Sequence, residues 1–194
     1  VTVDRQCGSS QQSVHFAAAA VMAGINDVVV AGGVQTMSKI PISAAMLAAE
    51  PLGFSDPFSG SEGWVARFGN TPVSQFQSAE MIAEKWDISR EEMEAFSLES
   101  HMRAQRAQDE GRFDKEIVPM EQLAKDETIR PNSTLEGMAG LDPLQEGGRI
   151  TAAVSSQTCD GASAMVIASE DAVKRYNLKP RARIHHMSVR ADDP

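Results

Sequence analysis

The sequence predicts an α/β fold, in which part of an alternating strand–helix core is interrupted by a mostly helical, polar insertion. Charge is the first observation: residues 1–36 contain three charged side chains, whereas residues 84–116 contain sixteen in thirty-three positions. The first stretch is therefore expected in the interior and the second at the surface. The second observation is that short apolar runs flank an alanine-rich segment, a pattern typical of a covered parallel sheet.

The first elements form a predicted βαβ unit. Residues 1–3 (VTV) and 28–30 (VVV) are predicted strands, the second ending at a Gly-Gly pair, and residues 10–23 are the helix between them. Ser9 and Gln12 have the spacing of a capping box, and apolar side chains recur at helical intervals. Gly24 follows, where a helix end favours the left-handed conformation.

The predicted insertion covers residues 39–145. Its first part, residues 41–72, contains turn formers and little periodicity, apart from a short helix near residues 43–49. Residues 78–86 form the next predicted helix. A short helix then begins at Ser133, with Glu136 in capping-box spacing, and stops at Gly140.

The longest predicted helix covers residues 89–110. Ser89 and Glu92 make its capping box, Gly111 ends it, and an apolar stripe that includes Met93 and Phe96 predicts its inward face.

Strand patterns resume after the insertion, at residues 149–154 and 162–168, followed by a helix at 170–176 and a closing strand at 182–191. We therefore assign 1–38 and 146–178 to a partial core and 179–194 to the start of a further domain. Predicted strands close to both ends, and a first residue other than Met, indicate a piece of a longer chain.

Composition excludes several classes of protein. Eighteen basic against 27 acidic residues give a net charge of −9, which argues against nucleic acid as a partner. The longest apolar run has eight residues, whereas a membrane-spanning helix needs about 20. Two cysteines and no visible signal peptide indicate a reducing compartment, the cytoplasm.

Cys7 is the candidate nucleophile. It lies between the first predicted strand and the helix, beside Gly8, where backbone amides and the helix dipole favour the thiolate over the thiol. The alternative is a small buried hydrophobe. Cys159 has Asp160 as its neighbour, and because a carboxylate disfavours a thiolate we interpret Cys159 as structural.

A general base is harder to find in the sequence. His15 lies about 12 Å along the helix from Cys7, and His101 belongs to the highly charged helix, where a solvated position is expected. His185 and His186 are adjacent in a predicted strand and would point to opposite faces. No metal-ligand or phosphate-loop motif is present, so no metal site is predicted.

Several motifs in order resemble the thiolase family. They are VDRQCGSSQQ at residues 3–12, AGGVQTMS at 31–38, AQDEGRF at 107–113 with EIVP at 116–119, TLEGMA at 134–139 and DGASA at 160–164. The resemblance covers the whole chain, corresponds to the middle of a thiolase, and implies part of a βαβαβαββ core with an inserted loop domain.

The resemblance also implies chemistry and site residues. Cys7 would attack the keto carbon of a 3-ketoacyl-CoA, and coenzyme A would then take the acyl group from the sulfur. Arg130 would lie near the nucleotide end of coenzyme A, Met138 against its pantetheine and adenine side, and Ser156 on the pantetheine arm. Coenzyme A is then a substrate rather than a permanent cofactor. Family members are usually homodimers or homotetramers.

Departures from the family leave alternatives open. The Gly-His-Pro, Cys-x-Gly-x-Gly and Asn-Glu-Ala-Phe motifs of the family's second half do not occur in this sequence, so the chain is expected to be an incomplete catalytic unit. Val154 replaces a common Asn, and together with residues 155–157 (SSQ) favours degradative members that act on bulky acyl chains, including steroid side chains. The alternative function is a non-catalytic segment that binds acyl-CoA or a partner, and a related ketoacyl synthase is disfavoured by the insertion's motifs.

Overall fold

The computed structural model describes residues 1–54, 58, 61–70 and 73–191. The chain divides into two compact units: Val1–Ile42 with Cys159–Pro194, and Ser43–Thr158. We call them the ribbon unit and the helical unit. The helical unit starts four residues later than the predicted insertion and ends thirteen residues later. Residues 192–194, the last of the predicted further domain, lie outside the described residues.

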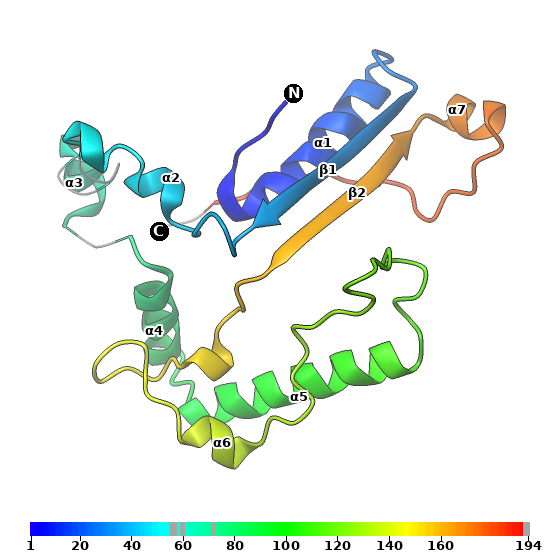
Figure 1. Cartoon of the computed structure of the whole chain (residues 1–194). Helices are drawn as coiled ribbons and strands as arrows, with labels where there is room; N and C mark the ends of the chain where they lie inside the picture. Colours follow the sequence, from blue (N-terminus) through cyan, green and yellow to red (C-terminus); the bar gives the residue numbers. More distant parts are fainter. Residues whose placement is uncertain (55–57, 59–60, 71–72, 192–194) are drawn as a thin grey trace. The chain divides into compact units, whose positions relative to one another are not determined.

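The ribbon unit contains one helix packed along two long strands (Figure 1). A 3₁₀ turn, η1 (Gln6–Gly8), leads into α1 (Ser9–Met22), and β1 (Val28–Thr36) pairs antiparallel with β2 (Asp160–Ala168). Helix α7 (Glu170–Arg175) follows β2. The order helix, strand, strand is that of the closing part of the βαβαβαββ pattern, and the fold is α/β as predicted.

Small side chains form the core of the ribbon unit. Ala17 and Ala18 of α1 are buried against Ala31 of β1 and Ile167 of β2. Alanine favours the helix and lets it approach the strands closely. The opposite face of the ribbon is exposed, with Val30, Val34 and Val166 at 67%, 75% and 59% of their full exposure.

The predicted parallel βαβ unit is wrong for this chain. Residues 1–3 have no regular structure, and β1 pairs with β2 in the only sheet of the described residues. The predicted strand at 149–154 is a single bridge, Pro143 to Thr151, followed by η3 (Ala152–Val154), and residues 182–191 form no strand. Apolar pattern does not suffice, because a strand needs a neighbouring ladder of hydrogen bonds.

The predicted capping box of α1 is also wrong. Gly8 is the N-cap residue and no side chain caps the helix. The Ser9 hydroxyl instead accepts the backbone N–H of Arg5 at 2.8 Å, so it is used to close the preceding turn. At the other end Gly24 has φ of +71°, as the sequence predicts.

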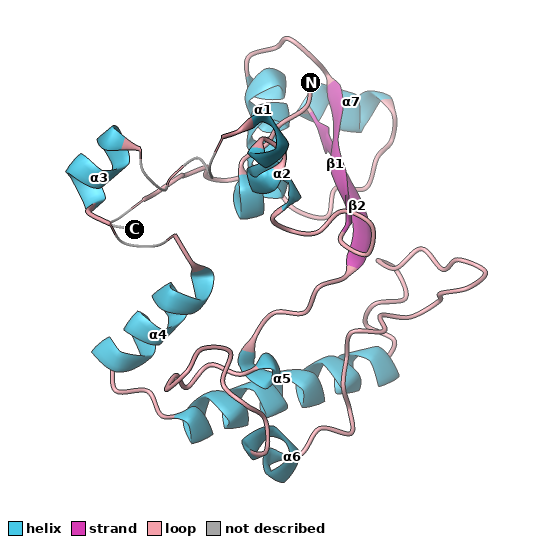
Figure 2. Ribbon diagram, turned by 60° about the vertical axis from the view of Figure 1, so that its left-hand side comes forward, coloured by secondary structure: helices cyan, strands magenta, loops and turns pink. Residues whose placement is uncertain are grey.

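The described residues of the helical unit form helices and no strand (Figure 2). Besides η3 the elements are α2 (Ala44–Leu47), η2 (Glu50–Leu52), α3 (Glu62–Phe68), α4 (Gln75–Lys85), α5 (Arg90–Asp109) and α6 (Leu135–Ala139). Helices η2 and α3 lie in the stretch predicted to be irregular. Short helix α6 is capped by Thr134 rather than by Ser133.

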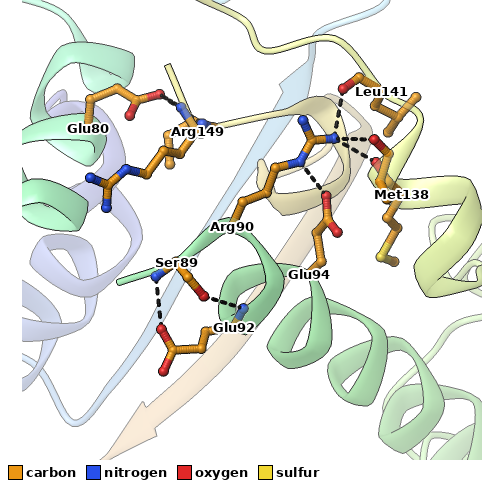
Figure 3. A network of polar contacts seen from close by, with 10 residues as sticks. Glu80, Ser89, Arg90, Glu92, Glu94, Met138, Leu141 and Arg149 are labelled. Atoms are coloured by element: carbon orange, nitrogen blue, oxygen red, sulfur yellow. Dashed lines mark hydrogen bonds and ion pairs between the residues drawn. The ribbon is translucent and has the colours of Figure 1, made fainter. Parts of the chain in front are cut away.

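The capping box of α5 is confirmed: Ser89 and Glu92 each bond the other's backbone N–H (Figure 3). The inward face of α5 differs from the prediction, however. Glu94 is only 2% exposed, whereas Phe96 is 81% exposed. Arg90 explains the buried carboxylate, because its guanidinium pairs with Glu94 at 2.6 Å.

Arg90 also joins α5 to α6. Its Nη2 donates to the backbone oxygens of Met138, Ala139 and Leu141, at 2.7 to 3.0 Å, where α6 ends (Figure 3). The Met138 carbonyl also accepts the Leu141 N–H at 3.0 Å. A cation is well placed beside the carboxyl end of a helix. Within the described part of the chain, no helix combines the length and apolarity needed to cross a membrane.

Candidate active site

The structure exposes Cys7 within η1, immediately before α1. The alternative considered from sequence, that Cys7 is a small buried hydrophobic residue, is therefore wrong. The thiol lies at the amino end of a fourteen-residue helix, where the helix dipole favours negative charge. Cys159 is exposed as well, at the start of the second segment of the ribbon unit.

The turn that carries Cys7 has a strained backbone. Gln6 has φ of +43°, a left-handed conformation that costs a non-glycine residue about 1 kcal/mol or more. Hydrogen bonds hold it: the Gln6 N–H donates to Asp4 Oδ1 at 3.1 Å, and the Ser9 hydroxyl donates to the Gln6 carbonyl at 2.7 Å. The Gly8 N–H donates to the Arg5 carbonyl at 3.0 Å. The position of Cys7 is therefore fixed from both sides.

Gly8 leaves room for the side chain of Arg5. A Cβ atom at Gly8 would lie 3.4 Å from Arg5 Nη1, and the same nitrogen donates to Gln12 Oε1 at 3.4 Å. The guanidinium thus packs over the first turn of α1, beside the residue that follows Cys7. Its positive charge adds to the field of the helix amino end.

A second polar contact lies at the end of the ribbon where β1 ends and β2 begins. Asp160 accepts hydrogen bonds from the Ser38 hydroxyl and, at 2.8 Å, from the Ser38 N–H. These bonds, the hydroxyl's first, hold the pKa of the Asp160 carboxyl below its ordinary value. Two of the motifs recognised in the sequence, at 31–38 and 160–164, are thereby brought together.

Ser156 lies on an irregular segment of the helical unit that three side chains hold in place. The Glu80 carboxylate accepts the N–H groups of residues 149 and 150, at 2.7 and 2.8 Å. The Ser97 hydroxyl donates to the Ala153 carbonyl at 2.6 Å, and Gln157 Nε2 donates to the Thr128 carbonyl. Figure 3 shows the contact between Glu80 and Arg149.

Ser156 also lines a cavity of about 700 Å³ in the helical unit, a volume in the range of ligand sites. Its apolar wall includes Trp86, Met93 and Phe96, and its polar wall includes His101, Ser156 and Gln157. Exposed Trp86 and Phe96, at 61% and 81%, are thus directed to one hollow. Such a site suits a ligand with an aliphatic part and amide groups.

Arg130 is exposed, and its backbone is fixed by a histidine. The Arg130 N–H donates to Nδ1 of His101 on α5 at 3.2 Å, and the Arg130 carbonyl accepts the Ser133 N–H at 3.2 Å. His101 is half-buried, so the expectation of a solvated position is wrong. The residue faces the loop that carries Arg130.

Met138 occupies a different environment. It lies on α6 and is 5% exposed, beneath the contacts of Arg90. The structure therefore brings Arg130 and Ser156 into one neighbourhood of the helical unit through His101 and Gln157, and buries Met138. Cys7 belongs to the ribbon unit.

Sequence reasoning missed His101 and Gln157 as part of this neighbourhood. Their partners lie 29 positions away along the chain, which no local spacing could indicate. His185 and His186 are not placed on opposite strand faces, because no strand forms there. Among the described residues, His, Cys, Asp and Glu form no group of three suited to a metal ion.

Comparison with known families gives a match over most of the chain. The model of the thiolase N-terminal domain matches residues 1–171. A steroid 3-ketoacyl-CoA thiolase of Mycobacterium tuberculosis is 57% identical over 198 residues, which cover 100% of this chain and 48% of the relative. A 3-ketoacyl-CoA thiolase of Aliivibrio fischeri is 38% identical over 204 residues, covering 100% of this chain and 50% of the relative.

Solved structures agree. Human mitochondrial 3-ketoacyl-CoA thiolase in complex with CoA matches with a TM-score of 0.73 and 32% identity, over 92% of this chain and 46% of that one. An acetyl-CoA acetyltransferase from Syntrophomonas wolfei matches with a TM-score of 0.72 and 34% identity, over the same shares. The chain spans about half the length of the relatives it matches.

Proposed function

The chain belongs to the thiolase family, and on that premise we propose that the protein carrying it cleaves 3-ketoacyl-CoA by acyl transfer through Cys7. The Cys7 thiolate attacks the keto carbon, and the bond between that carbon and the α-carbon breaks. The α-carbon takes a proton and leaves as acetyl-CoA. The thiol of coenzyme A then loses a proton, which balances the one taken by the α-carbon, and attacks the acyl-cysteine, so that a shortened acyl-CoA leaves and the thiolate returns.

The observation that carries this proposal is the exposed thiol of Cys7 in a braced, strained turn at the amino end of α1. A fixed thiol at that position has the electrostatic environment of a nucleophile. Arg5 reinforces it, since its guanidinium packs on the same first turn.

The helical unit is proposed as the cover of coenzyme A. Exposed Arg130 suits a phosphate or adenine of the nucleotide, in an otherwise acidic protein. Ser156 and the mostly apolar cavity beside it suit the pantetheine arm. Met138 would contribute by supporting α6 from within, because its side chain is buried. Residues 179–194 are proposed as the start of the second core domain.

The proposed substrates are 3-ketoacyl-CoA esters with bulky acyl chains, and the proposed direction of the reaction is degradation. One relative is named a steroid 3-ketoacyl-CoA thiolase, and it is 57% identical to this chain. Fatty-acid or steroid side-chain β-oxidation in the cytoplasm follows as the proposed setting.

A homodimer or homotetramer is proposed as the assembly. The apolar face of the ribbon, with Val30, Val34 and Val166 exposed, supports burial against further protein.

Thiol labelling tests the proposal directly. Iodoacetamide at neutral pH is expected to modify Cys7 well before Cys159, and an acyl-CoA is expected to leave its acyl group on Cys7. The Cys7→Ser variant should lose acyl transfer, while Cys159→Ser serves as the matched control. Equal labelling of both thiols, or acylation that survives Cys7→Ser, would contradict the proposal.

The second candidate is binding of acyl-CoA without turnover, which exposed Arg130 and the cavity beside Ser156 would support by themselves. Calorimetry with coenzyme A together with a thiolysis assay separates the two. Binding without thiolysis by the intact protein supports the second candidate, and thiolysis excludes it.

A further inference from the structure

We infer that His101 and Gln157 are positioning residues that fix the backbone of residues 128–130 and so present Arg130 to coenzyme A. The ligand part of this inference rests on the proposed function. The positioning part rests on two hydrogen bonds that reach the same short segment from two directions.

His101 supplies the first hold. Its Nδ1 accepts the Arg130 N–H at 3.2 Å, so the neutral ring carries its proton on Nε2. The imidazole belongs to α5, a twenty-residue helix with a complete capping box. A long, well-capped helix is a rigid base for holding a loop, which makes the acceptor atom a fixed point.

Gln157 supplies the second hold. Its Nε2 donates to the Thr128 carbonyl, two residues before Arg130. Thr128 is constrained in addition by Asp126, whose Oδ1 accepts both the N–H and the hydroxyl of Thr128 at 2.8 and 2.7 Å. Segment 126–130 is therefore ordered by side chains, although it contains no helix or strand.

The same two side chains also line the cavity beside Ser156. Arg130 and Ser156, assigned to two different parts of coenzyme A, are thus linked through the side chains between them. Because the entropy of ordering a loop opposes binding, a loop that is ordered beforehand binds its ligand more tightly. The geometry therefore assigns His101 a role in the affinity for coenzyme A rather than in the chemical step.

Two variants of His101 distinguish an acceptor from a packing residue. His101→Phe keeps a ring of similar volume and removes the acceptor, whereas His101→Asn loses the ring and keeps an oxygen near the position of Nδ1. If the acceptor atom matters, His101→Phe should lose the hold on the Arg130 N–H and His101→Asn should keep it. If packing alone matters, the order is reversed. Gln157→Glu tests the second hold, because a carboxylate cannot donate to the Thr128 carbonyl.

The first readout is amide hydrogen exchange of Arg130 in the intact protein, which needs no ligand. Exchange is expected to become at least about fivefold faster in His101→Phe and to return towards the original rate in His101→Asn. His186→Phe, an exposed histidine of the ribbon unit, is the control and should change nothing. Unchanged exchange in His101→Phe overturns the positioning role.

The second readout is calorimetric Kd for coenzyme A, together with KM and kcat in thiolysis. His101→Phe and Gln157→Glu are expected to raise Kd and KM by about fivefold each and to leave kcat unchanged. A fall in kcat without a change in Kd overturns the inference. An unmodified protein that binds no coenzyme A overturns the proposed function and the ligand part of this inference, while amide exchange still decides the positioning part.

Discussion

Asp160 accepts two hydrogen bonds from Ser38, which lies 122 positions earlier in the chain. Asp160 belongs to the last rung of the ribbon, where it faces Thr36, and Ser38 follows two residues after that rung. The bonds stabilise the carboxylate form, and they lower the pKa of Asp160 below its ordinary value of 3.8. The contact therefore contributes to stability wherever Asp160 is ionised in the folded protein.

Acid should remove this contribution. Because the folded-state pKa of Asp160 is lowered, its contribution is complete above the unfolded value near 4 and is lost as the pH falls through the folded value. Thermal melting from pH 7 to pH 3 should show a smaller loss of Tm below pH 4 in Asp160→Asn than in the unmodified protein. Ser38→Ala should also reduce the loss of Tm below pH 4. The double variant should differ little from either single variant. Additive effects would contradict the pairing.

Two ion pairs on α5 should differ in their contribution to the free energy of unfolding. Arg90 and Glu94 are paired with side chains 24% and 3% exposed, whereas Arg103 and Glu99 are paired at 71% and 50%. Arg90→Met is expected to cost roughly 3 kcal/mol of unfolding free energy, because it leaves a buried carboxylate uncompensated. Arg103→Met should cost less than about 1 kcal/mol.

Urea unfolding followed by far-UV circular dichroism measures both changes. Arg90→Lys should fall between them, since it keeps the charge but reaches fewer carbonyls of α6. Equal losses from Arg90→Met and Arg103→Met would show that burial does not govern these pairs.

Adjacent glycines of β1 should respond differently to the same change. A Cβ atom at Gly32 would lie 2.8 Å from the Ser163 carbonyl oxygen, on the partner strand, whereas nothing lies within 4 Å of a Cβ at Gly33. Gly32→Ala is expected to destabilise the ribbon by about 1–3 kcal/mol, through displacement of the backbone of β2. Gly33→Ala should be close to neutral, and differential scanning calorimetry of the two variants checks the difference.

The strained turn before the nucleophile gives another test. Gln6 has φ of +43°, so Gln6→Gly should leave Tm unchanged or raise it, because glycine adopts this conformation without a steric cost. Gln6→Val should lower stability by about 1–2 kcal/mol, because a β-branched side chain fits a left-handed conformation poorly. If both variants melt alike, the turn is not under the conformational constraint described.

Local sequence signals predicted local structure well. Ser89 and Glu92 identified the start of α5, and Gly24 and Gly111 have positive φ where helices end. These features depend on neighbours within one helical turn. The cap of α1 failed for an equally local reason, because the Ser9 hydroxyl is bonded to the Arg5 N–H.

Pairings between distant residues could not be predicted in the same way. The antiparallel ladder joins β1 to a strand more than a hundred residues later. The sequence of neither strand indicates which strand it pairs with or in which direction. Likewise, the inward position of Glu94 depends on Arg90 and on carbonyls near residue 140. In the candidate site, Cys7 was proposed from its local context, whereas the contacts of His101 and Gln157 could be seen only in the fold.

The register of the ribbon places the exit of β1 opposite the entry of β2, with Thr36 facing Asp160 and Ser38 bonded to Asp160. The segment Ser43–Thr158 is consequently an insertion that leaves and rejoins the ribbon unit at the same end of its two strands. Insertions with closely spaced ends place little constraint on the host domain. A change in the length of the helical unit is therefore expected to leave the geometry of the strands and of the cysteine turn unchanged.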